Sequence, residues 1–369
     1  MLKRAGLIII LILFTIIFNA FLNPFPKKNV PEGFRSGYGV SFSFEQAGWY
    51  GLEPKKAYVD LLDSVRFDWV RLPFFWDKTF LRSEGATDGQ VTNLNLEELK
   101  FGIEEAKKRN IKVIVALGAK TPYYPEYHLP ENIKSRAKFG DTFTLNHPIA
   151  ADLLAVDRAV VIELSKYENV AYWQVENEPL LANVNNWKIG EDLVKAEVEL
   201  VRSTDPKRRP IILNHVGPAV FDKKYRELLP LLLPGDVFGV NTYFKTQCTY
   251  LFSFKLGAKQ IDVPWPEWLV WPVQSWLGFS TDFGGVKKEV ENRGLKFWVL
   301  EMQAEPYVRT KEDINKIFDY FKADDILKAD KFLRSSRVES IGLWGSSYWL
   351  YKRGLGDSSW IDAVKVVVN

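Results

Sequence analysis

Two stretches of the sequence place carboxylates directly after an apolar run. In VAYWQVENEP the carboxylates are Glu176 and Glu178, and in FWVLEMQAEP, further along the chain, they are Glu301 and Glu305. Both runs predict buried strands, and the proline that closes each stretch lacks the N–H that a strand ladder needs. Hydrolysis of a glycosidic bond uses two carboxyl groups, one that protonates the leaving oxygen and one that attacks or activates water. The two stretches therefore predict glycoside chemistry, provided that the fold brings them together.

Apolar runs and amphipathic segments alternate along the chain from residue 37 onward, which predicts strands alternating with helices. The predicted strands are 37–44, 67–72, 111–117, 170–179 with its carboxylate end, 210–213, 237–243, 297–301 and 340–344. The segments predicted between and after them are 54–65, 95–110, 147–167, 191–202, 223–232, 285–292, 311–333 and 359–367. This alternation calls for right-handed parallel crossovers and closure. We expect an α/β fold, a single (β/α)8 TIM barrel over residues 36–369.

The barrel would bring the carboxylates together. The carboxyl ends of its strands meet at one mouth, where active sites are built. Glu178 ends the fourth predicted strand and Glu301 ends the seventh, so we expect them to lie across the mouth from each other. Burial and the charge of its partner could then hold one carboxyl neutral, as an acid, while the other stays ionised.

Composition narrows the classes of partner. The 369 residues carry a net charge of +3, and charged residues, at 26%, are well mixed, so no basic stripe predicts a nucleic-acid partner. One cysteine and three scattered histidines predict neither a disulfide framework nor a zinc motif. We expect no metal and no other cofactor. The thirteen tryptophans are unusual and indicate stacking surfaces for a ligand or an interfacial role.

The N-terminus is predicted to be a targeting segment. Lys3 and Arg4 precede an uncharged, largely apolar run, whose apolar core from Ala5 to Leu22 exceeds the ~7–15 residues of a signal-peptide core and approaches the ~17–25 of a spanning helix. We expect residues 1–23 to be a signal-anchor or a signal peptide and residues 24–35 to be a linker. The body would then be extracytoplasmic, anchored to the membrane or alternatively secreted.

The carboxylate stretches also carry a family resemblance. The Asn177-Glu178-Pro179 triplet after strand four, with a glutamate ending strand seven, resembles the clan A retaining glycoside hydrolases. The nearest match is the cellulase-like glycoside hydrolase family 5 and its unclassified relatives, over about residues 37–365. The resemblance implies that Glu178 is the acid/base, Glu301 the nucleophile, and Asn177 a donor to the sugar 2-hydroxyl.

The resemblance implies further substrate-site residues at other strand ends. Arg71, in VRLP, would orient the nucleophile, and Tyr243, in VNTYF, would donate a hydrogen bond to it. Trp344, in GLWG, would be the aromatic platform under the sugar at the cleavage point, and His215, just past strand five, a polar contact to substrate. Glu45 and Gln46, after strand one, are further candidates for sugar contact.

Some features depart from the family pattern. Many members carry a histidine at the end of strand three, whereas here the chain continues as LGAKTPYYPEYHLP and His128 lies further along. Glu176 and Glu305 are rival carboxylates to Glu178 and Glu301. Strand alternation gives Glu176 the same facing as Glu178, so we expect Glu176 to lie deeper in the barrel, held by Arg71 or another donor.

The longest insertion, from Lys245 to about Gly284, holds Trp265, Trp268, Trp271 and Trp276. It predicts either a wall of stacking platforms along a glycan cleft or an apolar patch that rests on the membrane. Taken together, the sequence predicts a retaining β-glycosidase that acts on an oligo- or polysaccharide. The alternatives are a cell-surface carbohydrate-binding barrel without hydrolysis and a transglycosidase that remodels surface glycans.

Overall fold

The fold is given by a computed structural model that describes residues 29–81, 93–217, 223–244, 250–256, 259–264, 283–306, 308, 311–314 and 321–369. Eight strands form a closed barrel in the order β1-β14-β13-β10-β9-β7-β5-β2, and every neighbouring pair is parallel. The strands are β1 (Gly37–Ser41), β2 (Trp69–Pro73), β5 (Lys112–Leu117), β7 (Val170–Val175), β9 (Ile211–Val216), β10 (Val237–Thr242), β13 (Lys296–Gln303) and β14 (Ser340–Trp344). The predicted (β/α)8 TIM barrel is confirmed.

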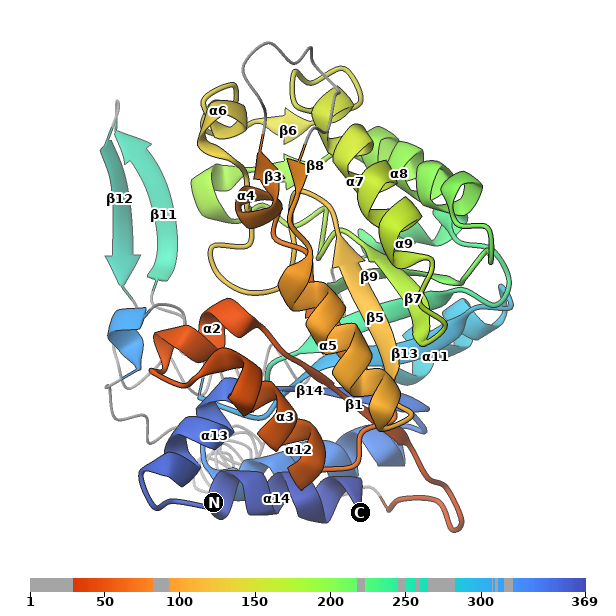
Figure 1. Cartoon of the computed structure of the whole chain (residues 1–369), viewed down its shortest axis with the longest axis vertical. Helices are drawn as coiled ribbons and strands as arrows, with labels where there is room; N and C mark the ends of the chain where they lie inside the picture. Colours follow the sequence, from red (N-terminus) through yellow and green to blue (C-terminus); the bar gives the residue numbers. More distant parts are fainter. Residues whose placement is uncertain are drawn as a thin grey trace, which may run out of the picture.

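Helices surround this barrel (Figure 1). They are α2 (Phe44–Trp49), α3 (Pro54–Ser64), α4 (Trp76–Thr79), α5 (Glu97–Lys108), α6 (Glu131–Lys134), α7 (Ala150–Leu164), α8 (Glu191–Thr204), α9 (Tyr225–Leu228), α11 (Phe283–Glu291), α12 (Ala323–Ser335), α13 (Ser346–Gly354) and α14 (Ser359–Val368). Short 3-10 turns are η1 (Val184–Asn186), η2 (Leu229–Leu231) and η3 (Lys311–Asp313). Small sheets outside the barrel pair β3 (Phe80–Leu81) with β4 (Asn93–Leu94), β6 (Thr142–Phe143) with β8 (Lys188–Ile189), and β11 (Tyr250–Leu256) with β12 (Lys259–Pro264).

Several predicted boundaries differ from the structure. Strand one was predicted to reach residue 44, but β1 ends at Ser41 because the hydroxyl of Ser43 accepts a hydrogen bond from the Gln46 amide at 3.1 Å and begins helix α2. The segment predicted as one helix over 311–333 contains η3 and, from Ala323, α12. Helix α13, directly after strand eight, was not predicted.

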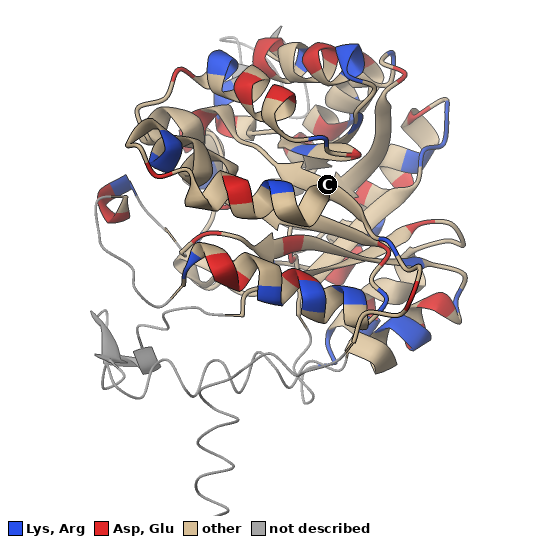
Figure 2. Cartoon of the chain, turned by 90° about the horizontal axis from the view of Figure 1, so that it is seen from below, with Lys and Arg blue, Asp and Glu red and all other residues tan. Residues whose placement is uncertain are grey.

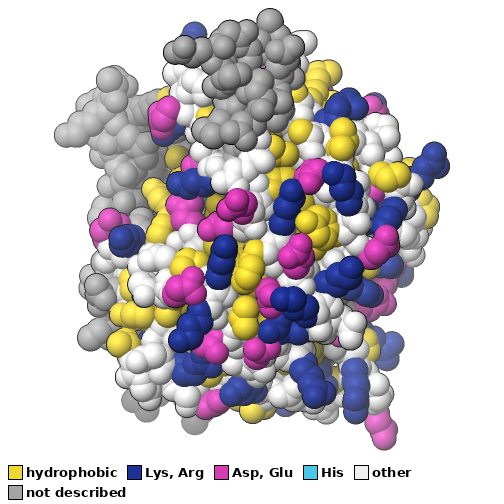
Figure 3. All heavy atoms as spheres, viewed as in Figure 1, with side chains coloured by type: hydrophobic (Ala, Val, Ile, Leu, Met, Phe, Trp, Pro, Cys, Tyr) yellow, Lys and Arg dark blue, Asp and Glu magenta, His cyan; other side chains and the backbone are white. Residues whose placement is uncertain are grey.

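Helix α5 illustrates how the helices cover the barrel. Leu99, Ile103 and Ala106 recur at three- and four-residue spacing and are buried. Gly102 lies among them and allows close approach to the barrel, since a Cβ there would lie 2.8 Å from Leu72. Figure 2 shows basic and acidic residues interspersed along the helices, and on the face in Figure 3 hydrophobic side chains are scattered among charged ones.

The barrel interior has an apolar layer below a polar one. The apolar layer consists of Trp69, Ile114, Ile212, Val237, Trp298 and Leu300. Gly39 and Gly342 make room for the Trp69 indole, because a Cβ would lie 2.0 Å from the ring at Gly39 and 2.5 Å from it at Gly342. Two residues along strand β2, the side chain of Arg71 lies in the polar layer, nearer the mouth where the strands end.

Some sequence predictions concern residues outside the described ranges. The expected anchor or signal segment, 1–23, lies outside them, and so do Trp265, Trp268, Trp271 and Trp276 of the insertion. The described part of the insertion includes the β11–β12 hairpin, which stands clear of the barrel helices in Figure 1. In the part of the chain that the structure describes, no helix is long and apolar enough to cross a membrane.

Candidate active site

A cavity of about 230 Å³ opens at the mouth of the barrel, where the predicted carboxylates meet. It is lined by Gln46, Tyr123, Tyr124, Glu126, Asn177, Glu178, Asn183, Tyr243, Glu301, Val308 and Trp344. The fold therefore brings the two predicted carboxylates together with three of the predicted substrate residues. The lining also contains Gln46, which was a candidate for sugar contact.

The Glu301 carboxylate is held at both oxygens. Arg71 Nη2 donates to Oε1 at 2.6 Å, and the Tyr243 hydroxyl donates to Oε2 at 2.6 Å. Arg71 is fully buried, and its other nitrogens donate to Ser41 Oγ at 2.8 Å and to Gln174 Oε1 at 3.2 Å. A buried guanidinium fixed at three points positions the carboxylate through a charge-assisted hydrogen bond. Arg71 and Tyr243 thus lie where the resemblance implied.

A β-bulge in β13 turns Glu301 into the barrel. Val299 pairs with Val240 of β10, but the next pair is Glu301 with Asn241, so Leu300 is an extra residue. Leu300 packs in the apolar interior layer. Strict alternation after Leu300 would point the next side chain outward, and a bulge re-aims it. Both Leu300 and Glu301 therefore face inward.

Glu178 lies in an environment that favours its protonated form. Burial raises the pKa of its carboxyl to about 8. The charge of Lys120 and a 2.8 Å hydrogen bond from Asn241 Nδ2 lower the pKa, whereas the charge of Glu301 raises it. At neutral pH the carboxyl is therefore mostly protonated and able to donate a proton.

Lys120, three residues after the end of β5, is a buried residue that the sequence reading missed. Its ammonium donates to the carbonyl oxygens of Glu178 at 2.9 Å and Leu181 at 3.0 Å, and lies 3.4 Å from Glu126 Oε2. These contacts hold the segment that carries Glu178, whose backbone φ of 48° is unusual for a residue other than glycine. The only sequence signal is a lysine shortly after an apolar strand, which is common on protein surfaces.

Asparagines at two strand ends form an amide network around Asn177. Asn214 donates through Nδ2 to Asn177 Oδ1 at 2.8 Å and accepts from the Glu178 amide at 3.0 Å. Asn241 contacts the same Asn177 oxygen at 3.5 Å. Because the Asn177 side-chain oxygen accepts from these donors, Asn177 can offer its amide nitrogen to a ligand. Asn214 and Asn241 were missed, although both are polar residues near the ends of apolar strands.

His215, which was expected to contact the substrate, does not line this cavity. It lines a separate cavity of about 470 Å³ together with Leu180 and Lys224. Successive side chains alternate along β9. Asn214 points inward to the amide network, so His215, the next residue, faces the other way.

Glu176 also departs from its predicted facing. Its φ of 56° breaks strand alternation, and the carboxylate instead accepts from the amides of Ala119 at 2.8 Å and Lys120 at 2.6 Å. Glu176 is fully buried behind the strand, where it interacts with Asp157 of α7 and Glu197 of α8. It is therefore held by other donors, as expected, but not inside the barrel.

The second rival, Glu305, is buried and lies outside the lining of the carboxylate cavity. Burial raises its pKa to about 8. His128 also lies outside the lining of the carboxylate cavity. Its ring stacks on that of Phe75, and the ring centroids are 3.9 Å apart. In the described part of the chain, no cluster of three or more His, Cys, Asp or Glu could hold a metal ion.

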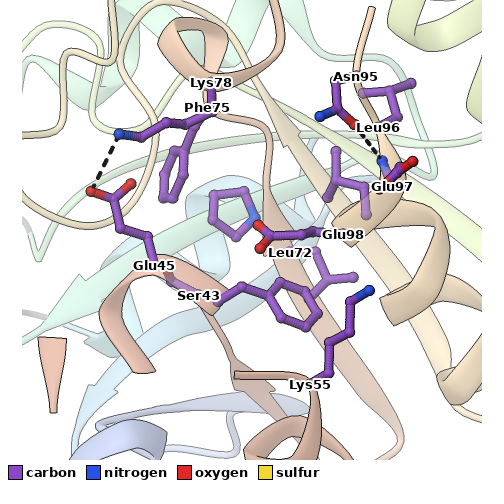
Figure 4. A pocket seen from close by; sticks show the side chains of 13 residues that line it. Ser43, Glu45, Lys55, Leu72, Phe75, Lys78, Asn95, Leu96, Glu97 and Glu98 are labelled. Carbon is purple, nitrogen blue, oxygen red and sulfur yellow. Dashed lines mark hydrogen bonds and ion pairs between the residues drawn. The ribbon is translucent and has the colours of Figure 1, made fainter. Parts of the chain in front are cut away.

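A larger cavity, of about 460 Å³, lies beside the mouth between α2 and the start of α5 (Figure 4). Glu45 points into it and lies 3.8 Å from Lys78 Nζ. The neighbouring residues Glu45 and Gln46 thus line different cavities, since Gln46 lines the carboxylate cavity and Glu45 lines the larger one. The larger cavity contains neither Glu178 nor Glu301, so size alone does not identify the reactive site.

Comparisons with known proteins agree with this geometry. The family model described as Cellulase (glycosyl hydrolase family 5) matches residues 32–231, more than half of the chain. This match confirms the resemblance to cellulase-like family 5 enzymes. No curated protein sequence matches significantly.

Solved structures share the barrel. Cel5A from Thermotoga maritima, in complex with mannotriose, is similar with a TM-score of 0.57 at 14% identity, covering 90% of this chain and 97% of that chain. A family 1 β-glucosidase from Thermotoga maritima has a TM-score of 0.53 at 14% identity, covering 93% and 99%. A GH113 β-1,4-mannanase has a TM-score of 0.51 at 13% identity, covering 91% and 98%. At these identities the similarity concerns the fold.

Proposed function

The chain belongs to the cellulase family, glycosyl hydrolase family 5, and on that premise we propose that it hydrolyses β-linked glycans by double displacement. Glu178 is the acid/base and Glu301 the nucleophile. The observation that carries this proposal is the contrast between two carboxyls in one cavity. Burial raises the pKa of Glu178 to about 8, whereas Glu301 accepts hydrogen bonds from a guanidinium and a phenol.

In the first step, a Glu301 oxygen attacks the anomeric carbon as the bond to the leaving oxygen breaks. Glu178 donates its proton to that oxygen, and the sugar becomes an ester of Glu301. The ester removes the negative charge that raises the pKa of Glu178, so the pKa falls. The Glu178 carboxylate is then suited to act as a base in the second step.

In the second step, Glu178 takes a proton from water as the water oxygen attacks the anomeric carbon. The ester bond breaks, Glu301 leaves as a carboxylate, and the sugar keeps its original configuration. Arg71 and Tyr243 orient Glu301, the Asn177 amide nitrogen donates to the sugar 2-hydroxyl, and Trp344 stacks on the sugar. The roles of Arg71, Tyr243 and Asn177 are supported by the hydrogen bonds to Glu301 and to the Asn177 oxygen. The role of Trp344 is supported by its place in the cavity lining.

For the substrate class we propose β-linked glucose or mannose glycans. The similar structures carry names that point to such sugars. One is Cel5A in complex with mannotriose, and the others are a β-1,4-mannanase and a β-glucosidase. The cavity volume of about 230 Å³ suits a single sugar unit at the cleavage point. The catalytic geometry supports a β-glycosidase, and it does not select between glucose and mannose.

The test is turnover of aryl β-glycosides and of glucan, mannan and galactan oligomers by the full chain and by Glu178→Ala and Glu301→Ala. We expect kcat to fall by at least ~10³-fold in Glu301→Ala on every substrate. Glu178→Ala should lose activity mainly on oligomers, whose leaving groups need the acid. Added azide should restore activity to both variants. Glu301→Ala should then form a glycosyl azide of inverted anomeric configuration, and Glu178→Ala one of retained configuration.

Glu305→Gln is the matched control, because a buried carboxyl with a raised pKa is replaced by a neutral group of the same shape. It should keep wild-type turnover. Activity that survives in Glu301→Ala without azide would contradict the assignment. Glycan binding without turnover by the wild type would identify a binding barrel, and transfer to a sugar in place of water would identify a transglycosidase.

We further propose that residues 1–23 hold this enzyme outside the cytoplasm, at the membrane. Lys3 and Arg4 followed by the long apolar run support the proposal. Fusion of a reporter that is active only outside the cytoplasm to the C-terminus should give signal, and the chain should stay with the membrane after alkaline extraction. Release by alkali would instead indicate secretion, and an inactive reporter would place the body inside.

A further inference from the structure

Tyr123 lies face to face with Trp344, the residue assigned above as the sugar platform. The ring centroids are 4.3 Å apart and the rings are inclined by 29°. Tyr123 follows β5 whereas Trp344 ends β14, and β2 and β1 lie between these strands in the barrel. The phenol ring therefore reaches past two strand ends at the mouth to cover the indole.

This contact leaves little of the platform available. Trp344 is only 7% exposed and Tyr123 only 6%, although both line the carboxylate cavity. A sugar that stacks on an indole needs an open face of that ring. With Tyr123 in place, the indole has no such open surface to offer.

The phenol of Tyr123 also lies close to the catalytic groups. Burial raises the pKa of Tyr123, and the charge of Arg71 lowers the pKa while those of Glu305 and Glu301 raise it. The ring therefore occupies the part of the cavity next to the Arg71–Glu301 pair, where the sugar at the cleavage point must lie.

The backbone holds Tyr123 in a conformation that suits glycine. Its φ is 83°, in the left-handed region that strains a residue with a large side chain. The Glu126 amide donates to the Tyr123 carbonyl at 2.7 Å, and the Thr121 amide donates to the Glu126 carbonyl at 2.9 Å. A turn that glycine would adopt without strain thus carries a large ring that is aimed into the cavity.

We propose that Tyr123 covers the stacking face of Trp344 in the free enzyme and that a sugar binds at the cleavage point only by displacing the phenol ring. The inference rests on the proposed function, since it requires Trp344 to be the sugar platform. Tyr123 is then a specificity-determining residue. Sugars with a broad apolar face regain the lost aromatic stack against Trp344, and sugars whose axial hydroxyls interrupt that face do not.

The test compares full-length wild type with Tyr123→Gly, a change that suits the φ of 83° and removes the ring. We expect KM for an aryl β-glycoside, and the Kd of an iminosugar measured by calorimetry, to fall about three- to tenfold, the range that one aromatic stack corresponds to. We expect kcat to change less than KM. Phe139→Gly is the control, because Phe139 is an aromatic residue that is 49% exposed and lies outside the lining of this cavity, and it should leave both constants unchanged.

Unchanged or higher KM and Kd in Tyr123→Gly would overturn the proposal, because Tyr123 would then be a fixed wall or itself the platform. Tyr123→Phe keeps the stacked ring and should behave as wild type; a fall in its KM would overturn the role of the ring. If thermal unfolding shows that Tyr123→Gly is misfolded, Tyr123→Leu takes its place with the same expected fall. Failure of the proposed function is seen separately, as wild-type turnover that does not depend on Glu178 and Glu301.

Discussion

The ammonium of Lys120 donates a 2.9 Å hydrogen bond to the main-chain carbonyl of Glu178, from a side chain that is fully buried. Its charge also lowers the pKa of the Glu178 carboxyl, against the larger effect of burial. One residue in the loop after β5 thus influences both the position and the acidity of the proposed proton donor.

Lys120→Met should shift the pH profile upward. Loss of the positive charge raises the pKa of Glu178 above about 8, so the basic limb of the kcat/KM profile moves to higher pH. The carbonyls of Glu178 and Leu181 lose a buried donor, which should lower the free energy of unfolding by about 2–4 kcal/mol. Urea denaturation and pH–rate profiles measure both effects.

Lys100→Met, which removes a surface ion pair with Glu163, is the control for Lys120→Met and should change neither the pH profile nor the free energy of unfolding. A basic limb that stays in place or moves to lower pH in Lys120→Met would contradict the prediction.

Glu301→Gln should lower the pKa of Glu178. The negative charge of Glu301 raises that pKa, and glutamine removes the charge while keeping the shape of the side chain. A titration of ¹³C-labelled glutamate by NMR should therefore show Glu178 in Glu301→Gln titrating below its value of about 8 in the wild type. Glu305→Gln should leave the Glu178 titration unchanged. A Glu178 pKa that is equal in wild type and Glu301→Gln would show that the two carboxyls do not interact as the mechanism requires.

Arg71→Lys should lower kcat far more than it changes KM. Lysine keeps the positive charge but cannot contact Ser41, Gln174 and Glu301 at once, as the guanidinium does. We expect kcat to fall by about 10²-fold because a charge-assisted bond that positions the nucleophile is lost or misaligned. Steady-state kinetics on an aryl β-glycoside measure the split, with Arg109→Lys, in a partly exposed ion pair with Asp63, as the control. An unchanged kcat would remove Arg71 from the positioning role.

The buried carboxyls of Asp157, Glu176 and Glu197 should make stability fall at alkaline pH. Burial raises the pKa of Asp157 to about 8, that of Glu176 to about 7, and that of Glu197 well above its ordinary value. In the unfolded chain these groups titrate near pH 4. The folded state therefore binds more protons at neutral pH, and the stability that this provides is complete below about pH 4 and is lost as the pH rises through 7 to 8.

We therefore expect Tm to fall by several degrees between about pH 6 and pH 9. The Tm of Glu197→Gln, which keeps a neutral group of the same shape, should fall less over this pH range. The Tm of Glu199→Gln, on the exposed face of α8, should fall as that of the wild type does. Thermal unfolding followed by circular dichroism at several pH values makes the measurement. A wild-type Tm that is constant across this range would mean that the three carboxyls are already ionised in the folded protein.

The sequence by itself determined the barrel and the identity of the two carboxylates at its mouth. Parallel strands that are buried on both faces read as continuous apolar runs, and covering helices read as amphipathic segments, so the order of elements follows from periodicity. Glu178 and Glu301 end such runs, and the carboxyl ends of the strands of one parallel barrel share a mouth. The Asn177-Glu178-Pro179 triplet then indicated the family that the family model confirms.

Only the tertiary structure decided which way individual side chains point. The bulge that makes Leu300 an extra residue turns Glu301 inward, and the positive φ of Glu176 turns that residue away from the mouth. Alternation along a strand predicts neither, because each is a local break in the regular backbone. The contacts of Lys120 with the Glu178 carbonyl and of Tyr123 with Trp344 join segments from different strand ends. Such contacts depend on closure of the barrel, which places those ends together, and no spacing in the sequence records them.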